Sequence, residues 1–340
     1  MKKLLKLPLL LIGFGLCLMA VSPDHGKESR SLQINGVNFV APSRVLKENP
    51  MQAVKEANAN WISVMPYAYG RKNSPEIRHN TAWQWWGEKT VGTIQTIKYA
   101  QEKKLKVMMK PHVWVQGDGW CGEFKLHNEE DWQAWEKAYE AYILPLAREA
   151  EKLGVEAFCI GTEYRLAVRE RKAYWRSLIA KIRKVYSGQL TYAANWDNYQ
   201  RVAFWDALDF IGIDAYWPLM DKKNASEEAL EKAWQPIYQE LRTYSKKQGK
   251  QIVFTEYGYR SVEYTARRPW ETSSAGAQSM QAQINAYEAL YGCFWDEPWF
   301  GGGFIWKWFD RHEGVGGESH GGFTPQNKPV MENIRRRYQR

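Results

Sequence analysis

The sequence predicts an α/β protein, a single (β/α)8 barrel (TIM barrel), for residues 32–340. Short apolar runs typical of buried parallel strands alternate with segments of helical periodicity, and no linker or change in composition divides them. The alternative fold is an open doubly wound sheet. That fold needs a glycine-rich turn after its first strand, and residues 37–42 (VNFVAP) do not supply one.

Eight short apolar runs are expected to form the strands. In chain order they are residues 34–40, 61–67, 106–114, 155–163, 190–196, 208–216, 251–256 and 303–308. Pro218 stops the sixth run, because proline cannot donate a hydrogen bond to a neighbouring strand.

The segments between these runs carry helical signals. The expected helices are residues 50–58, 91–103, 130–153, 168–186, 202–205, 226–247, 275–291 and 331–338. Gly154 and Gly188 follow two of them, as helix-ending glycines commonly do. Ser226 begins another helix, with Glu228 and Glu231 in its first turns.

The first 20 residues are interpreted as a secretory signal, because three lysines precede an apolar run at residues 7–20 that is too short to span a bilayer. Residues 21–31 are polar and are expected to be a flexible lead-in. These features predict a secreted or periplasmic protein, and no later segment is apolar enough to cross a membrane. Cys17 leaves lipid anchoring at the outer surface open, although Leu16 stands where lipoprotein signals usually carry a small residue.

The composition is that of an ordinary globular protein, with 340 residues, 44% hydrophobic and 25% charged. The net charge of +9 comes from basic residues spread along helical faces, without a nucleic-acid-binding module, so nucleic acid is not expected as a partner. The 18 tryptophans exceed what a core needs, and their flat amphipathic rings suit sugars. We expect a monomer that binds a polysaccharide or an oligosaccharide.

Beyond the signal the chain has three cysteines, and an odd number gives no disulfide framework. Cys159 lies inside a predicted strand and is interpreted as a core residue, whereas a bridge between Cys121 and Cys293 stays open. His312 and His320 lack a third ligand at a convincing spacing, so no metal is expected. No other cofactor is predicted.

Two predicted strands end in the same tripeptide, Thr-Glu-Tyr, at residues 162–164 and 255–257. A carboxylate at the edge of a buried core is costly unless it is paired or used. The carboxyl ends of barrel strands converge on one face, where active sites lie. We therefore expect Glu163 and Glu256 to face each other across one cleft. The structural alternative for Glu163 is an ion pair with Arg165 or with a cation on a neighbouring helix, and Glu256 could also be purely structural.

Other side chains are predicted at the same strand ends. His112 and Asn195 could hydrogen-bond sugar hydroxyls. Tyr216 could orient a carboxylate, and Trp306 could form a floor beneath a sugar ring. The remaining candidates for substrate binding are aromatic: Tyr67, Trp114 and Trp217. For Tyr216 and Trp217 the alternative is packing in the core or at its rim. A loop cluster of tryptophans is either a surface cluster or a sugar platform: Trp83, Trp85 and Trp86.

Two carboxyl groups, a histidine and many aromatic rings together fit a glycosidase cleft. Cleaving an acetal requires an acid to protonate the leaving oxygen and a carboxylate to meet the oxocarbenium-like centre. When the two carboxyl groups are about 5 Å apart, the carboxylate attacks directly and the configuration is retained.

Five stretches support a more specific comparison. They are residues 110–114 (KPHVW), 161–163 (GTE), 209–216 (DFIGIDAY), 255–259 (TEYGY) and 302–308 (GGFIWKW). In their order and spacing they resemble glycoside hydrolase family 113, a member of the large clan of retaining β-glycosidases built on this barrel. The likeness runs from about residue 34 to the C-terminus and includes residues 323–329 (FTPQNKP).

The resemblance implies that Glu163 is the acid/base, that Glu256 is the nucleophile, and that the activity is endo-β-1,4-mannanase. The sequence departs from the wider clan at Thr162, where most members carry an asparagine that holds the sugar 2-hydroxyl. Three alternatives stay open: a retaining glycosidase acting on another β-glycan such as glucan, a glycan-binding barrel without activity, and a sugar-phosphate enzyme. The acidic residues around the glycine-rich loop 314–322 disfavour a phosphate site.

Overall fold

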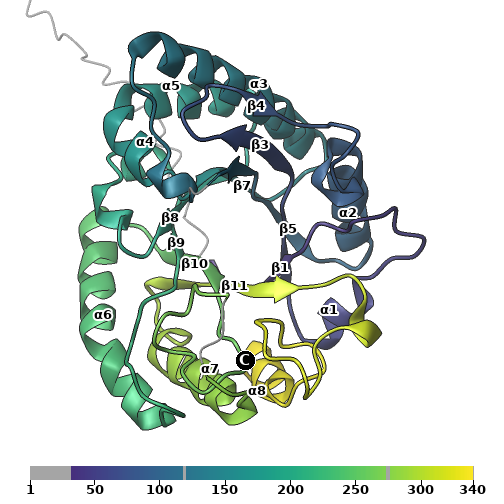
Figure 1. Cartoon of the computed structure of the whole chain (residues 1–340), viewed down its shortest axis with the longest axis vertical. Helices are drawn as coiled ribbons and strands as arrows, with labels where there is room; N and C mark the ends of the chain where they lie inside the picture. Colours follow the sequence, from purple (N-terminus) through teal and green to yellow (C-terminus); the bar gives the residue numbers. More distant parts are fainter. Residues whose placement is uncertain (1–31, 118–119, 273–275, 340) are drawn as a thin grey trace, which may run out of the picture. The chain divides into compact units, whose positions relative to one another are not determined.

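Eight parallel strands close into a barrel, and the helices lie outside them (Figure 1). The computed structural model describes residues 32–117, 120–272 and 276–339. The strand order around the barrel is β1-β11-β10-β9-β8-β7-β5-β2. The bounds are β1 Ile34–Phe39, β2 Trp61–Val64, β5 Lys106–Met109, β7 Ala157–Thr162, β8 Gln189–Asn195, β9 Ile211–Asp214, β10 Ile252–Tyr257 and β11 Phe300–Trp308. The predicted TIM barrel is confirmed.

The helices follow the predicted segments closely. They are α1 Gln52–Glu56, α2 Thr90–Glu102, α3 Glu129–Lys152, α4 Arg165–Glu170, α5 Lys172–Arg183, α6 Glu227–Gln248, α7 Met280–Phe294 and α8 Val330–Tyr338. The Ser226 hydroxyl accepts a hydrogen bond from the backbone N–H of Ala229 and so caps α6 as expected. Two predictions were wrong: residues 168–186 form two helices that meet at Arg171, and residues 202–205 hold no α-helix.

Three of the predicted strands were too long, and the sixth, residues 208–216, shortens to β9 (Ile211–Asp214). Residues 61–67 and 106–114 each divide between a barrel strand and a strand of a separate sheet, the side sheet, which consists of β3 (Tyr67–Arg71), β4 (Ile77–Arg78) and β6 (His112–Gln116) in the order β4-β3-β6. Pro66 and Pro111 stand at the two breaks, because a proline has no N–H for the barrel ladder. The side sheet carries part of the predicted site beyond the barrel.

Alternate strand residues fill the inside of the barrel and the layer beneath the helices. The smaller, inner cluster holds Ile34, Trp61, Met108, Ala157, Phe210, Val253 and Phe304. The larger cluster lies between strands and helices and includes five fully buried tryptophans: Trp135, Trp175, Trp205, Trp234 and Trp308. Several of the 18 tryptophans therefore pack in the core, and the others remain candidates for ligand binding.

The three described cysteines are free thiols, so the Cys121–Cys293 bridge that the sequence left open does not form. Cys159 is buried in β7, as predicted. Among the described residues, no helix combines the length and the apolar character needed to span a bilayer. The predicted signal, the lead-in and Cys17 fall on residues 1–31, outside the described part of the chain.

Candidate active site

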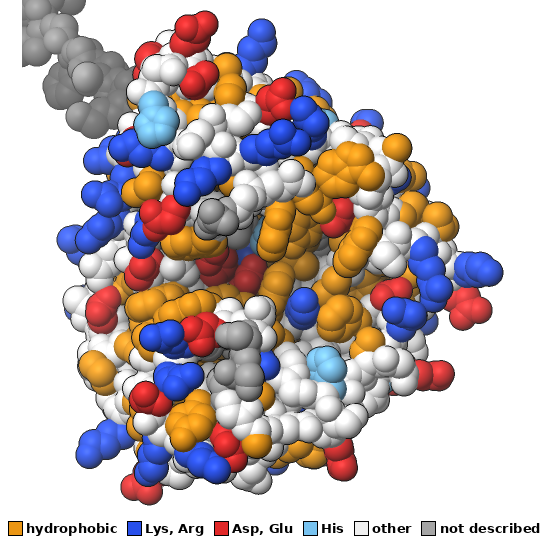
Figure 2. All heavy atoms as spheres, viewed as in Figure 1, with side chains coloured by type: hydrophobic (Ala, Val, Ile, Leu, Met, Phe, Trp, Pro, Cys, Tyr) orange, Lys and Arg blue, Asp and Glu red, His pale blue; other side chains and the backbone are white. Residues whose placement is uncertain are grey.

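A cleft opens at the carboxyl ends of the barrel strands. In Figure 2 it is a hollow with acidic side chains at its bottom and hydrophobic side chains around it. Two adjoining cavities of about 600 and 480 Å³ make up this cleft. Both cavities are lined by Trp114, Trp120, Glu163, Glu256 and Trp306. The first adds Asn195, Trp196, Asp197, Tyr216, Trp270, Thr272 and Phe323, and the second adds Tyr67, His112, Val113, Val115, Gly117, Cys121 and Thr162.

Glu163 directly follows β7 and has a left-handed backbone, with φ at +55°. A residue other than glycine in this conformation costs about 1 kcal/mol or more, so the surrounding structure must hold it. Its N–H donates to the Ala193 carbonyl in β8 at 2.8 Å, and its own carbonyl accepts from the N–H of Arg165 at 2.8 Å. This turn directs the side chain into the cleft, where Trp120 Nε1 donates to Oε2 at 2.6 Å.

The carboxyl of Glu163 favours the protonated form. Burial, followed by the charges of Asp214 and Glu256, raises its pKa to about 8, although the hydrogen bond from Trp120 acts in the opposite direction. The suggested ion pair with Arg165 is not present, because Arg165 instead pairs with Glu123 and with Asp197, the latter at 3.3 Å. Glu163 therefore carries a proton at neutral pH that it can donate.

Glu256 lies in β10 in the opposite kind of surroundings. The residue is only 6% exposed, and both carboxylate oxygens have donors. Oε1 accepts from Lys110 Nζ at 2.5 Å, and Oε2 accepts from the Tyr216 hydroxyl at 2.8 Å. Both contacts stabilise the ionised form. Burial and the charge of Glu256 raise the pKa of Tyr216 well above its usual range, so Tyr216 stays a hydrogen-bond donor.

Lys110 is fully buried and serves two carboxyl groups at once. Its Nζ also lies 3.1 Å from Oδ1 of Asp214, at the end of β9, and the Thr255 hydroxyl donates to that oxygen at 2.7 Å. Burial alone would lower the pKa of Lys110, but the charges of Asp214 and Glu256 outweigh it and raise the pKa. Burial and the charge of Glu256 raise the pKa of Asp214 to about 7. One cation therefore links three strand ends beneath the cleft.

His112 and Asn195 are placed where they can meet a ligand. Burial and the charge of Lys110 lower the pKa of His112 well below its usual value, so the ring is neutral. Its Nε2 lies 3.9 Å from Glu256 Oε1 and has no hydrogen-bond partner among the described residues. The side-chain amide of Asn195 donates to Asp197 at 2.9 Å, and Asn195 lines the cleft.

The site thus pairs a proton-bearing carboxyl with a carboxylate held by a cation and a hydroxyl, between aromatic walls. These are the groups that hydrolysis of an acetal requires. Within the described part of the chain, no group of three or more His, Cys, Asp or Glu side chains could hold a metal ion.

One protein-family model matches most of this chain. The family model described as Glycoside Hydrolase Family 113 matches residues 44–321, well over half of its length. The chain belongs to glycoside hydrolase family 113. It is therefore a glycosidase with a carbohydrate substrate, and the predicted family resemblance is confirmed.

Solved structures agree with this assignment. The family 113 β-mannanase AaManA from Alicyclobacillus acidocaldarius, in complex with ManMIm, is 26% identical with a TM-score of 0.81, covering 92% of this chain and 98% of that one. A family 113 β-1,4-mannanase is 25% identical with a TM-score of 0.76, covering 90% and 98%. The β-glucuronidase of Ruminococcus gnavus, 14% identical with a TM-score of 0.60 over 90% of this chain and 50% of that one, shares the fold. No protein of curated function matches in sequence.

The structure places one candidate of this family 113 enzyme outside the cleft. Trp217 is buried and its ring packs against Trp196, Trp234 and Phe254, so it belongs to the core, the alternative stated for it. Trp196 takes the cleft position instead and stacks on Trp270 with ring centroids 5.7 Å apart. The other sequence candidates all line the cleft: Tyr67, His112, Trp114, Glu163, Asn195, Tyr216, Glu256 and Trp306.

Several residues that shape the site were not among the candidates. Lys110 and Asp214 each carried a signal, because Lys110 directly follows an apolar strand and Asp214 is the last residue of one. Trp120 and Trp270 lie outside regular elements and follow no periodic pattern, so nothing in the sequence separates them from other loop tryptophans. Phe323 belongs to this second kind as well.

Proposed function

We propose that this family 113 hydrolase is a retaining endo-β-1,4-mannanase in which Glu256 is the nucleophile and Glu163 the acid/base. One observation carries the proposal: two carboxyl groups line the same cavities in opposite electrostatic surroundings. Divided surroundings of this kind separate the acid from the nucleophile in paired-carboxyl enzymes.

In the first step, Glu256 attacks the anomeric carbon while Glu163 gives its proton to the departing glycosidic oxygen. Lys110 and Tyr216 each donate a hydrogen bond to one carboxylate oxygen of Glu256 and so hold the attacking group in place. The products of this step are a glycosyl ester on Glu256 and a released sugar chain with a free hydroxyl.

In the second step, Glu163 must act as a base and accept a proton from the attacking water. Once Glu256 is esterified it carries no charge, and one cause of the raised pKa of Glu163 disappears. The pKa of Glu163 therefore falls at the point where the ionised form is needed.

The choice of mannan rests on relatives. Two solved family 113 structures at 26% and 25% identity are β-mannanases. Thr162, which stands where most of the clan has asparagine, is buried and directs its hydroxyl toward the Pro111 carbonyl at 3.5 Å. This supports a site that leaves the sugar 2-hydroxyl without that contact. Export of the chain, predicted from residues 1–20, is part of the proposal because a polymer substrate stays outside the cell.

Activity on purified polysaccharides tests the proposal. The wild type should release a series of oligosaccharides from β-1,4-mannan, seen by reducing-end assay and product sizing. Glu256→Gln should abolish hydrolysis, and Glu163→Gln should lower kcat by about 10²–10⁴-fold. Glu332→Gln, at an exposed position on α8, is the matched control and should retain activity.

Full activity of Glu256→Gln would refute its role as nucleophile. Faster hydrolysis of β-1,4-glucan than of mannan would refute the proposed substrate and leave the carboxyl pair intact as the proposed machinery.

A further inference from the structure

The side sheet presents a polar and aromatic face next to the cleft. Ala68, Val113 and Val115 are buried, although Val113 and Val115 also border the cleft, and the residues that alternate with them face outward. The outward residues form three cross-strand rows: Tyr67 with His112, Tyr69 with Trp114, and Arg71 with Gln116. The first row and Trp114 line the cleft. The third row lies four residues farther along the strands, roughly 13 Å away, within reach of a short oligosaccharide.

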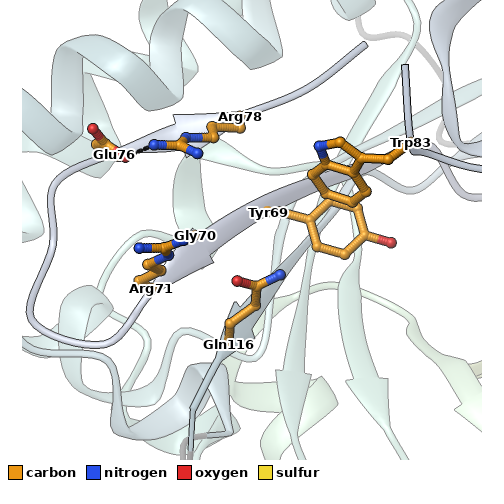
Figure 3. A pocket seen from close by; sticks show the side chains of 7 residues that line it. All are labelled: Tyr69, Gly70, Arg71, Glu76, Arg78, Trp83 and Gln116. Atoms are coloured by element: carbon orange, nitrogen blue, oxygen red, sulfur yellow. Dashed lines mark hydrogen bonds and ion pairs between the residues drawn. The ribbon is translucent and has the colours of Figure 1, made fainter. Parts of the chain in front are cut away.

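A separate cavity of about 160 Å³ lies at the outer end of this face. Figure 3 shows the residues that line this cavity. Tyr69 and Arg71 come from β3, Arg78 from β4, Trp83 from the loop after β4, and Gln116 from β6. A ligand that continues from the cleft along the side sheet would meet this cavity next.

The wall of this cavity carries an exposed aromatic ring that is held in place. Trp83 is 56% exposed, and its ring meets the Tyr69 ring at a centroid distance of 4.6 Å. Its neighbour Gln84 is buried and donates to the Tyr67 carbonyl at 2.9 Å, while the Tyr69 hydroxyl donates to Glu88 at 2.9 Å. An exposed tryptophan anchored in this way is suited to stacking on a sugar ring.

The charges around the cavity favour an anion. Arg78 pairs with Glu76 at 2.7 Å, but both side chains are more than half exposed, so this pair is weak. Arg71 forms no ion pair with any residue that the structure describes. The cavity thus has two guanidinium groups and one carboxylate. A guanidinium fork matches the oxygens of a carboxylate or a sulfate.

We propose that this cavity is a distal subsite for an anionic sugar unit, bearing a carboxylate or a sulfate, of the polysaccharide bound in the cleft. Trp83 stacks on the sugar ring, Arg71 binds the anionic group, and Gln116 and the Tyr69–Trp114 row connect the subsite to the cleft. The inference rests on the proposed action on a β-linked polysaccharide and adds that the substrate is acidic or carries acidic branches.

The rival explanation is general attraction, because the chain has a net charge of +9 and would attract any polyanion. A matched variant separates the two. Arg242→Gln removes the same charge from an exposed position on α6, away from the side sheet. General attraction predicts equal effects of Arg71→Gln and Arg242→Gln.

The experiment measures binding by calorimetry in the Glu256→Gln background, so that the ligands stay intact. The probes are β-1,4-linked manno-oligosaccharides that are neutral, that carry one glucuronate, or that carry one sulfate. The Glu256→Gln protein with an unchanged side sheet should bind an anionic probe more tightly than the neutral probe. Arg71→Gln should weaken binding of that probe by about tenfold, the scale of one charge-assisted hydrogen bond, and leave the neutral probe unchanged. Trp83→Ala should weaken all probes alike.

Comparison of the glucuronate and sulfate arms identifies which anion the subsite prefers. No preference for either anionic probe, or an Arg242→Gln variant that loses as much as Arg71→Gln, would overturn the inference. If the wild type hydrolyses another β-glycan instead, the mannan assignment fails separately. The ratio of the affinities for anionic and neutral probes, measured with oligosaccharides of that other glycan, then shows whether the distal subsite prefers an anion.

Discussion

At the scale of single residues, unfavourable features gather at Glu163. The residue has a left-handed backbone, and burial and neighbouring charges oppose ionisation of its carboxyl. Glu256, by contrast, sits in a regular strand with a donor on each oxygen. Strain of this kind persists where the surrounding structure enforces it for function. This asymmetry supports the proposed roles, in which Glu163 donates a proton and Glu256 attacks.

The pH profile of kcat/KM should reflect Glu163. In the wild type, kcat/KM should fall as the pH rises through about 8, because the free enzyme then loses the proton of its acid. Trp120→Phe should move this alkaline limb to higher pH, since the Trp120 hydrogen bond lowers the pKa of Glu163. Trp85→Phe, at an exposed position outside the cleft lining, is the control. A limb that stays in place or moves to lower pH in Trp120→Phe would contradict this account.

At the scale of elements, the ends of three barrel strands depend on one buried amine. Lys110 follows β5, Asp214 ends β9 and Glu256 lies in β10. Lys110 lies within 3.1 Å of both carboxyl groups. Removing one partner of such a buried group leaves a charge without compensation, and this costs more than the intact group contributes.

Lys110→Met should therefore lower the free energy of unfolding by about 3–5 kcal/mol at neutral pH. The pKa of Asp214 is already raised by burial and by the charge of Glu256, and the loss of Lys110 removes a charge that lowers it. The penalty should thus be small in acid, where the Asp214 carboxyl is protonated, and grow as the pH rises through the raised pKa. Denaturant unfolding at several pH values measures this. Lys106→Met, at an exposed position on β5, should change stability little, and an equal loss in both variants would contradict the prediction.

The strands of the barrel could be predicted from the sequence better than the side sheet could. The barrel strands were predictable because buried parallel strands are continuous apolar runs. Strands two and three were predicted too long because each barrel strand is followed, after a short break at Pro66 or Pro111, by a strand of the side sheet. The side sheet followed no signal of its own.

Within the site, Glu163 and Glu256 were predictable because a charge that ends a buried strand needs a reason. The tryptophans were harder, because adjacent strand ends can send similar residues to opposite sides. Trp196 reaches the cleft whereas Trp217 packs in the core. Trp120 and Trp270 depend on loop geometry, which hydrophobic periodicity does not encode.

At the scale of the whole molecule, the end of the chain holds the barrel closed. β1 pairs with β11 and so closes the barrel. Tyr338 of α8 contacts residues of β1 and β10. Its hydroxyl donates to the Gly36 carbonyl at 3.0 Å and lies 2.7 Å from the Tyr257 hydroxyl. The side-chain amide of Asn35 donates to the backbone carbonyl of Tyr338 at 3.2 Å. These contacts join the first strand to the last helix on the outside of the barrel.

Tyr338→Phe should lower the free energy of unfolding by about 1–3 kcal/mol, because buried partners lose their hydrogen bond. Thermal or denaturant unfolding measures this loss, and kcat/KM well below the unfolding temperature should not change. Tyr99→Phe serves as the control, since its hydroxyl makes no hydrogen bond to a described residue. An equal effect of both variants would show that the Tyr338 hydroxyl does not support closure.

The two prolines that interrupt the second and third barrel strands give the enzyme a modular design. β3, β4 and β6 hydrogen-bond only to one another as a ladder, apart from the eight-stranded ring. Residues at the outer end of this sheet, such as Arg71 and Gln116, can therefore be exchanged without shifting the register of the barrel strands. Under the proposed roles, recognition of distant sugars at these outer positions is separable from bond cleavage in the barrel.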